Sequence, residues 1–236
     1  MGNFDIKIEK FLKAFIDNGG YHNVLTGLKN TMEIAIIGLL IGIAIGTLIA
    51  SIRVLPKYRT LPRVLDKICS FYVAIFRGTP MVVQLLVFYY VLMPLMGIKI
   101  DGLNVAITVF GLNSGAYVSE IMRGGILSVD PGQLEGGRSV GMSYATTMFK
   151  IVIPQAIKNI LPTIGNEFIT LVKETSIVSF VGAMDLYKVF NDIGTNNYEF
   201  MVPYLVMAVI YIIIVCLITL GIKFMERRLR KSDRRS

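Results

Sequence analysis

Five long apolar stretches constrain the fold of this chain more than any other feature of its sequence. They cover residues 30–52, 68–96, 103–126, 157–183 and 200–224, each near or above the ~20 residues that a helix needs to cross a bilayer. Over the whole chain, 54% of residues are apolar and only 17% are charged. The sequence therefore predicts an all-α, polytopic membrane protein with five transmembrane helices. These helices leave no room for a soluble catalytic domain.

The basic residues indicate how the helices are oriented. The connections between the spans alternate, and 16 of the 24 lysines and arginines fall on one alternate set: Arg53, Lys57, Arg59, Arg63, Lys67, Arg123, Arg138, Lys150, Lys158, Lys223, Arg227, Arg228, Arg230, Lys231, Arg234 and Arg235. The opposite connections hold only Lys99 and Lys188. By the positive-inside rule, the tail and the long loop after the third span are cytoplasmic and the N-terminus is external. The net charge of +8 is thus a topology signal, and nucleic-acid binding is the weaker interpretation.

Three segments follow from this pattern: residues 1–20, a transmembrane domain over 21–226, and a basic cytoplasmic tail over 227–236. In the first segment apolar residues repeat at helical spacing opposite three lysines: Phe4, Ile8, Phe11, Leu12 and Phe15 against Lys7, Lys10 and Lys13. This predicts a short external helix lying in the membrane interface. A frayed amphipathic tail is the alternative.

Residues for enzyme chemistry are absent from the sequence. It has no Gly-Lys-Ser or Gly-Lys-Thr phosphate loop and no Gly-x-Ser-x-Gly elbow. Cys69 and Cys216 are far apart, and His22 is the only histidine, so neither a disulfide nor a zinc site is implied. We therefore expect no enzyme activity, no metal and no cofactor in this chain.

Six charged residues remain within the predicted spans once the charges already assigned to the loops and the tail are set aside: Glu33, Arg77, Glu120, Glu167, Lys173 and Glu174. A charge in the membrane costs at least ~2.5 kcal/mol, so it normally faces a partner or a water-filled cavity. At ~1.5 Å per residue, Arg77 and Glu120 lie at similar depth. We predict that they pair or bracket a substrate pathway. The alternative is a strut between helices that touches no ligand.

Polar side chains form stripes on two of the spans. Asn113, Tyr117 and Glu120 share one helix face, with Ser114 beside them, and Glu167, Thr170 and Glu174 repeat this spacing before Thr175 and Ser176. Hydroxyls and amides can also simply join membrane helices. Two stripes with carboxylates favour a cavity, and four acids against two bases suit a substrate with a cationic end, such as a basic amino acid.

The second span contains Arg77-Gly78-Thr79-Pro80 amid apolar sequence. Pro80 lacks a backbone donor and disfavours helical geometry at Thr79. The carbonyl groups released near residue 76 must then find polar partners, because lipid offers none. Arg77 and Thr79 are candidate substrate contacts at this kink. The alternative is an ordinary proline bend.

The loop over residues 130–156 is longer than a helix reversal needs, since such connections usually take ~2–8 residues. It contains Pro131-Gly132, Glu135-Gly136-Gly137 and Gly141-Met142-Ser143, and it ends with Ile153-Pro154-Gln155-Ala156. This composition predicts a short folded element on the membrane surface, of the kind that a soluble partner protein could grip.

Together these motifs resemble the permease subunit of ATP-binding-cassette (ABC) importers of the polar amino acid class. The resemblance covers residues 24–226 and rests on four segments: Phe76-Arg77-Gly78-Thr79-Pro80 with Gln84, Glu120-Ile121-Met122-Arg123-Gly124-Gly125-Ile126, Glu135-Gly136-Gly137 with Gly141 and Ile153-Pro154, and Lys173-Glu174-Thr175-Ser176. The family's coupling loop usually begins Glu-Ala-Ala and ends Leu-Pro. Each glycine in place of an alanine weakens a short helix by ~1 kcal/mol, so we expect this loop either to be less rigid or to approach its partner closely.

The resemblance implies a set of partners. A second permease, identical or related, would complete the pathway in a prokaryotic cell membrane. Two separate ATPase subunits would bind ATP and magnesium, and an extracytoplasmic binding protein would deliver the amino acid. The residues implied in coupling are Glu135, Gly136, Gly137, Gly141, Met142 and Ser143.

The substrate implied is arginine, lysine or histidine first, and glutamine or another polar amino acid next. Two other functions compete with this one. An ion-gradient transporter would predict inverted repeats, and the sequence has no convincing internal duplication. A lipid-modifying enzyme using Glu167 and Glu174 would lack a nucleophile or a metal set.

Overall fold

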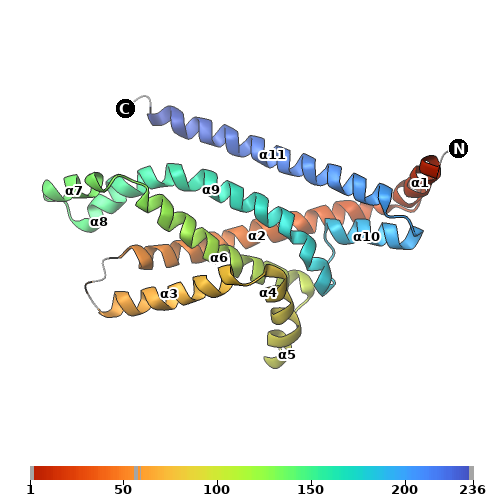
Figure 1. The fold of residues 1–236 in the computed structure, drawn as a ribbon, viewed down its shortest axis with the longest axis horizontal. Coiled ribbons are helices and arrows are strands. Elements are labelled where there is room, and N and C mark those ends of the chain that lie inside the picture. Colours follow the sequence, from red (N-terminus) through yellow and green to blue (C-terminus); the bar gives the residue numbers. More distant parts are fainter. Residues whose placement is uncertain (1–2, 56–57, 59, 234–236) are drawn as a thin grey trace. The chain divides into compact units, whose positions relative to one another are not determined.

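A computed structural model describes residues 3–55, 58 and 60–233, and every regular element among them is helical. The elements are α1 (Asn3–Leu12), η1 (Lys13–Asp17), α2 (Gly20–Val54), α3 (Thr60–Gly78), α4 (Met81–Val87), η2 (Phe88–Leu92), α5 (Met93–Leu95), α6 (Gly102–Leu127), α7 (Pro131–Ser139), α8 (Tyr144–Thr147), η3 (Met148–Val152), α9 (Ile153–Glu174), η4 (Thr175–Val181), α10 (Leu186–Asn197) and α11 (Met201–Asp233) (Figure 1). The predicted all-α class is confirmed for the described residues. Four of the basic residues used for orientation, Lys57, Arg59, Arg234 and Arg235, lie outside them.

The chain forms two compact units, and four helices, α2, α6, α9 and α11, contribute residues to both. The first unit contains residues 1–38, 80–110 and 170–217, and the second contains residues 39–79, 111–169 and 218–236. Each is described separately below.

Three of the described helices are long and apolar enough to cross a membrane: α2, α6 and residues 201–229 of α11. The stretch predicted as the second span is broken at Thr79–Pro80 into α3 and α4, bent by 105°, and would be a fourth crossing if the bent pair counts as one. The stretch predicted as the fourth span consists of α9 followed by the 3₁₀ helix η4. Five spans and their orientation therefore stay a prediction.

Close packing of α2 on α6 organises the second unit. Gly42 and Gly46 of α2 face Ser114 and Val118 of α6, where a methyl group on either glycine would lie 2.5–2.7 Å from those side chains. Gly111 and Gly115 of α6 face Ile41 and Ile45 of α2 in the same manner. Pairs of small residues four positions apart let membrane helices approach closely. These four glycines therefore let the two helices approach each other closely.

The first unit has a hydrophobic core between short helices. Phe11 of α1 is buried together with Val24, Leu186, Val189, Phe190, Ile193 and Val202, from α2, α10 and α11. Ile8 and Phe15 pack against this core, whereas Phe4 and Leu12 stay 49% and 45% exposed. The predicted N-terminal helix thus exists, but part of its apolar face is covered by α10.

A buried carboxyl group begins α10. Asp185 accepts hydrogen bonds from the N–H groups of Tyr187 and Lys188, at 3.0 and 2.9 Å, and so caps the helix. The preceding turn is held by α2, since Asn30 donates to the carbonyl of Met184 and Thr31 accepts from the N–H of Leu186. Burial raises the pKa of Asp185 to about 6, although the hydrogen bonds from the two N–H groups and the nearby Lys188 oppose the shift.

Candidate functional site

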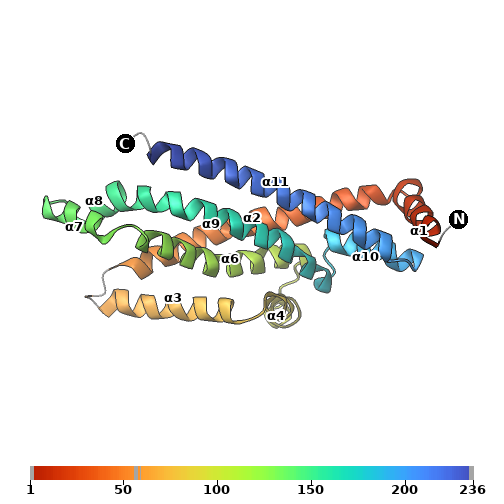
Figure 2. The same ribbon diagram turned by 45° about the horizontal axis from the view of Figure 1, so that its top comes forward.

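The predicted surface element in the loop over residues 130–156 is a helix, α7, with defined signals at its start. Asp130 precedes it and accepts a hydrogen bond from the N–H of Gly132 at 2.7 Å. Pro131 occupies the first helical position, where its missing N–H is not needed. A side-chain cap of this kind contributes ~1 kcal/mol to a helix. Figure 2 shows α7 and α8 together beyond the end of α9.

The end of α7 is closed by a glycine in the left-handed region. Gly141 has φ +87°, its N–H bonds to the carbonyl of Arg138, and the N–H of Met142 bonds to the carbonyl of Gly137, both at 3.1 Å. This pair of bonds is the Schellman motif, which favours glycine at that position. Ser143 then caps α8 by accepting from the N–H of Thr146 at 3.1 Å. Three of the predicted coupling residues therefore form one turn between two short helices.

The two glycines that replace the family's alanines have different surroundings. A methyl group on Gly136 would meet nothing within 4 Å, whereas one on Gly137 would lie 2.5 Å from Cγ2 of Thr147 in α8. Gly137 is buried, and Glu135 and Gly136 beside it are exposed. Gly137 therefore packs closely on another part of the same chain, and the expected close approach of this loop to a partner stays a prediction.

The base of the loop is packed and hydrogen-bonded. Val129, Met148, Val152, Ala156 and Ile160 form a buried cluster beneath it. Asn159 of α9 donates to the hydroxyl of Ser128 at 2.9 Å, and the Tyr144 hydroxyl donates to the carbonyl of Val54 at 3.3 Å. Burial raises the pKa of Tyr144, helped by the nearby Tyr58. Helix α7 therefore projects from a fixed base.

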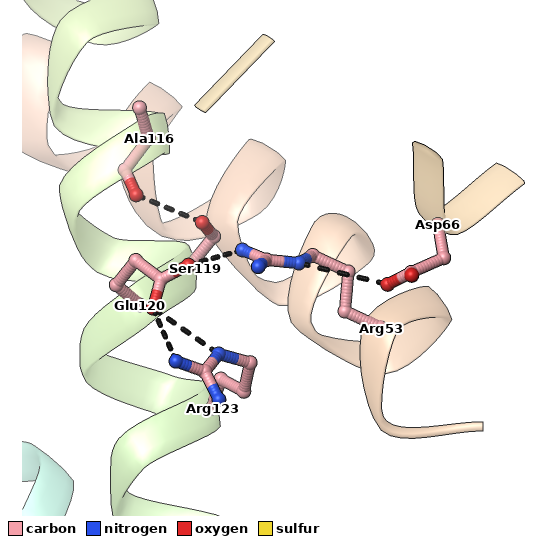
Figure 3. Close-up of polar contacts among 6 residues, drawn as sticks. All are labelled: Arg53, Asp66, Ala116, Ser119, Glu120 and Arg123. Carbon is pink, nitrogen blue, oxygen red and sulfur yellow. Dashed lines mark hydrogen bonds and ion pairs between the residues drawn. The ribbon is translucent and has the colours of Figure 1, made fainter. Parts of the chain in front are cut away.

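An ionic cluster lies between α2, α3 and α6 (Figure 3). Glu120 accepts a hydrogen bond from Arg53 through one carboxylate oxygen, and its other oxygen accepts from Nη2 of Arg123 at 2.7 Å and from its Nε at 3.1 Å. Arg53 also lies 3.8 Å from the carboxylate of Asp66. The two acids and two bases balance, so the cluster holds the three helices together without a net charge.

The predicted direct pair between Arg77 and Glu120 is wrong. Both oxygens of Glu120 are occupied by Arg53 and Arg123, while the guanidinium of Arg77 lies over the ring of Tyr117, 5.2 Å from its centroid. Arg53 lies in the last turn of α2, directly after the first apolar stretch, and brings a closer guanidinium to the carboxylate. From the sequence, Arg53 and Arg123 served to orient the spans, and Arg123 also belonged to a family motif, but none of the three residues was predicted to bind Glu120. Their position at the ends of spans beside an intramembrane acid was the signal that could have identified the cluster.

The carbonyl groups released by Pro80 have partners, as the sequence predicted. The carbonyl of Phe76, four residues before the proline, accepts a hydrogen bond from the amide of Asn113 in α6 at 3.3 Å. The carbonyl of Ile75 accepts from the hydroxyl of Thr79 at 2.8 Å. Asn113 and Thr79 therefore stabilise the broken end of α3, and their contact with the substrate stays a prediction.

The other residues of the first stripe also lie in the second unit. Ser114 is fully buried against Gly42 of α2, and Tyr117 is half-buried beneath Arg77. The structure thus brings together Arg77, Asn113, Tyr117 and Glu120 on one side of α6. Of these, Arg77 is the exposed one.

The second stripe crosses from one unit to the other along α9. Glu167 belongs to the second unit and is half-exposed, and Thr170, Glu174 and Ser176 belong to the first. Helix α9 ends at Glu174, so Ser176 lies in η4 and not on the predicted helix face. Ser176 and Lys173 instead line a cavity of about 510 Å³ with Tyr187, Tyr211 and Cys216. Sequence reasoning did not assign Lys173, Tyr187 or Tyr211 to a site.

Comparison with known proteins identifies the class. The family model described as binding-protein-dependent transport system inner membrane component matches residues 38–231. The chain is 37% identical over 210 residues to the arginine transport system permease protein ArtQ of Bacillus subtilis, covering 89% of this chain and 94% of that protein. It is 38% identical over 206 residues to a putative glutamine transport system permease protein, GlnP, of Rickettsia bellii, covering 87% and 92%.

A solved structure agrees with these relatives. An amino acid ABC transporter crystallised with histidines matches with a TM-score of 0.82 at 36% identity, covering 88% of this chain and 94% of that chain. The chain belongs to the family of inner-membrane components of binding-protein-dependent transport systems. The resemblance to ABC importer permeases of the amino acid class is thereby confirmed.

Proposed function

We propose that this chain is the permease subunit of an ABC importer for polar amino acids, with arginine, lysine or histidine as first substrates. It works in a prokaryotic cell membrane with its C-terminus in the cytoplasm. A second permease, identical or related, completes the pathway. ATP and magnesium are bound by two separate ATPase subunits, and an extracytoplasmic binding protein delivers the amino acid.

The observation that carries this proposal is the geometry of α7. The helix is capped at both ends, rests on a buried base, and exposes Glu135. A carboxylate on a fixed helix can form charge-assisted hydrogen bonds with basic groups in a cleft of an ATPase subunit. Because the base of the loop is packed onto α9, movement of the ATPase is transmitted into the membrane helices.

The preference for a basic amino acid rests on carboxylates within the predicted spans. Glu120 already pairs with Arg53 and Arg123, so we assign the attraction for a cationic substrate to Glu174, which is half-exposed. The relative named for arginine supports this preference, and the relative named for glutamine supports the alternative, a polar uncharged amino acid.

Uptake into vesicles tests the substrate and the energy source together. The permease is reconstituted with its ATPase and binding protein, and uptake of radiolabelled arginine is measured with unlabelled lysine, histidine or glutamine as competitors. We expect uptake only with ATP, and stronger competition by lysine and histidine than by glutamine. Stronger competition by glutamine selects the alternative substrate, and uptake on an ion gradient without the ATPase contradicts an ABC importer.

Three substitutions test the role of the loop in the same vesicles. Glu135→Gln removes the exposed charge, and Gly141→Ala places a side chain at φ +87°. Both should lower arginine uptake per ATP hydrolysed while leaving membrane insertion intact. Gly221→Ala in α11 is the control, because it lies outside the loop and its new methyl group meets nothing within 4 Å. Undiminished coupling in both of the first two variants would count against the loop as the contact.

A further inference from the structure

Among the described residues, Tyr198 is the one residue other than glycine with a positive φ. Its φ is +52° and its ψ is +34°, whereas the other positive φ values belong to Gly19, Gly97, Gly141 and Gly182. For a residue with a side chain this conformation is unfavourable, because Cβ comes too close to the following carbonyl oxygen. The Tyr198 side chain is 93% exposed, so contacts within the chain do not compensate for the strain.

Hydrogen bonds at the end of α10 impose this conformation. The N–H of Tyr198 bonds to the carbonyl of Thr195 at 3.3 Å, and the N–H of Glu199 bonds to the carbonyl of Gly194 at 3.0 Å. This is the Schellman pattern, in which Tyr198 takes the place usually given to glycine. A strained residue that persists without a structural benefit is a reason to look for a functional one.

The residues on either side of Tyr198 are held in place. Glu199 pairs with Lys7 of α1 at 3.2 Å and accepts from the N–H of Met201 at 2.9 Å. Desolvation alone would raise the pKa of Glu199, but these two contacts lower it below its usual value. The ring of Phe200 packs on Gly194 and lies 5.6 Å from the ring of Tyr204. The backbone is therefore preorganised and presents one aromatic side chain to its surroundings.

The position of Tyr198 just before α11 indicates on which side of the membrane its binding partner lies. Helix α11 begins at Met201, and its 33 residues at ~1.5 Å each exceed the thickness of a bilayer. Its two ends then lie on opposite sides of the membrane. Since the basic tail is placed in the cytoplasm by the positive-inside rule, Tyr198 is placed outside. The external protein partner of a binding-protein-dependent system is its binding protein.

We propose that Tyr198 is a contact residue through which the α10–α11 turn binds the extracytoplasmic binding protein. This inference rests on the proposed function. Tyrosine is enriched among the residues that dominate protein–protein binding, because it offers a large contact area with few rotatable bonds. A turn already fixed by Lys7, Glu199 and Phe200 loses little further freedom on binding. Partner contact explains why glycine does not occupy this position.

The test measures ATP hydrolysis by the complete transporter in vesicles as the concentration of its own arginine-loaded binding protein is raised. Tyr198→Gly removes the ring and relieves the strain, and Tyr198→Phe keeps the ring. Tyr58→Gly is the matched control, because Tyr58 is 92% exposed but follows α2 on the side predicted to be cytoplasmic.

For Tyr198→Gly we expect unchanged hydrolysis without binding protein, and a half-saturating concentration of binding protein at least tenfold higher. Tyr198→Phe and Tyr58→Gly should stay within twofold of the wild type. An unchanged half-saturating concentration in Tyr198→Gly overturns the inference, and if that variant also inserts poorly, the tyrosine serves the membrane interface instead. A wild type that its binding protein does not stimulate contradicts the proposed function itself.

Discussion

The turns that end α7 and α10 have the same pattern of backbone hydrogen bonds, but different types of residue take the left-handed conformation in them. After α7 the residue is Gly141, and after α10 it is Tyr198. The first choice follows what the backbone favours, and the second opposes it. Since both turns have the same hydrogen bonds, the fold alone would favour glycine in each. The tyrosine at position 198 therefore indicates an additional role.

The regions beneath the two turns differ as well. The α7 loop belongs to a unit in which α2, α3 and α6 are joined by the charges of Arg53, Asp66, Glu120 and Arg123. The turn after α10 rests on an apolar core and on the buried, hydrogen-bonded Asp185. The stability of the region beneath the α7 loop should therefore depend most on its ion pairs. The stability of the region beneath the turn after α10 should depend most on pH.

The largest effect is expected from Glu120→Gln. The side chains of Arg53 and Glu120 are only 15% and 17% exposed, so the substitution leaves a poorly solvated guanidinium without its counter-charge. Breaking such a pair costs ~3 kcal/mol or more, which lowers the melting temperature by ~6 °C or more in a chain of this size. Thermal unfolding of the purified protein measures it. The double variant Arg53→Leu with Glu120→Leu should recover much of the loss, and no recovery would show that the pair is not the cause.

The next effect is a pH dependence due to Asp185. Its pKa is raised from 3.8 to about 6, so the folded state binds the proton more tightly than the unfolded state. The stabilising contribution is therefore full below about pH 4 and is lost as the pH rises to about 6. Each pKa unit corresponds to ~1.4 kcal/mol, which gives an effect of ~1–3 kcal/mol.

Asp185→Asn isolates this contribution, because asparagine also caps helices but carries no charge. At pH 7 the variant should melt a few degrees above the wild type, and at pH 4 the two should coincide. Parallel melting curves for the two proteins across this range would mean that Asp185 does not titrate as described.

A smaller effect is expected at Gly137. Gly137→Ala forces a methyl group to within 2.5 Å of Thr147, and overpacking of this kind costs ~1–3 kcal/mol. Cleavage by trypsin after Arg138, which is exposed, should become faster as α7 separates from α8. Gly136→Ala should slow this cleavage, since alanine strengthens a helix by ~1 kcal/mol. Equal cleavage rates in the two variants would contradict the packing of Gly137 on α8.

The smallest effects compare the two turns directly. Gly141→Ala should destabilise the protein by ~1 kcal/mol and Tyr198→Gly should stabilise it by a similar amount. The corresponding shifts of the melting temperature are ~2–4 °C in opposite directions. Shifts of the same sign would show that Tyr198 is not strained in solution.

Hydrophobicity and proline chemistry made much of the fold predictable. Long apolar stretches predicted α2, α6 and α11, and the missing N–H of Pro80 predicted that the carbonyl near residue 76 would need a partner, which Asn113 supplies. These signals are local, because each depends on residues within one helix.

The missed features depend on which helices lie side by side. The sequence placed Arg77 and Glu120 at equal depth, but depth does not determine which face of a helix a residue takes or which neighbour is nearer. The fourth apolar stretch continues beyond Glu174 as a 3₁₀ helix, and the packing of Phe11 on α10 covers a face that was expected to meet lipid. In each case the outcome depended on tertiary packing, which the pattern of a single segment does not determine.

The glycine contacts between α2 and α6 have a mechanical consequence. Helix α6 ends at Leu127, three residues before α7 begins, and it is fastened to α2 by Gly42, Gly46, Gly111 and Gly115 and by the Arg53–Glu120 pair. We expect that a displacement of α7 cannot bend α6 alone, because α6 packs directly on α2. We therefore expect α2 and α6 to tilt together, so that a small displacement of α7 moves both helices of the second unit at the same time.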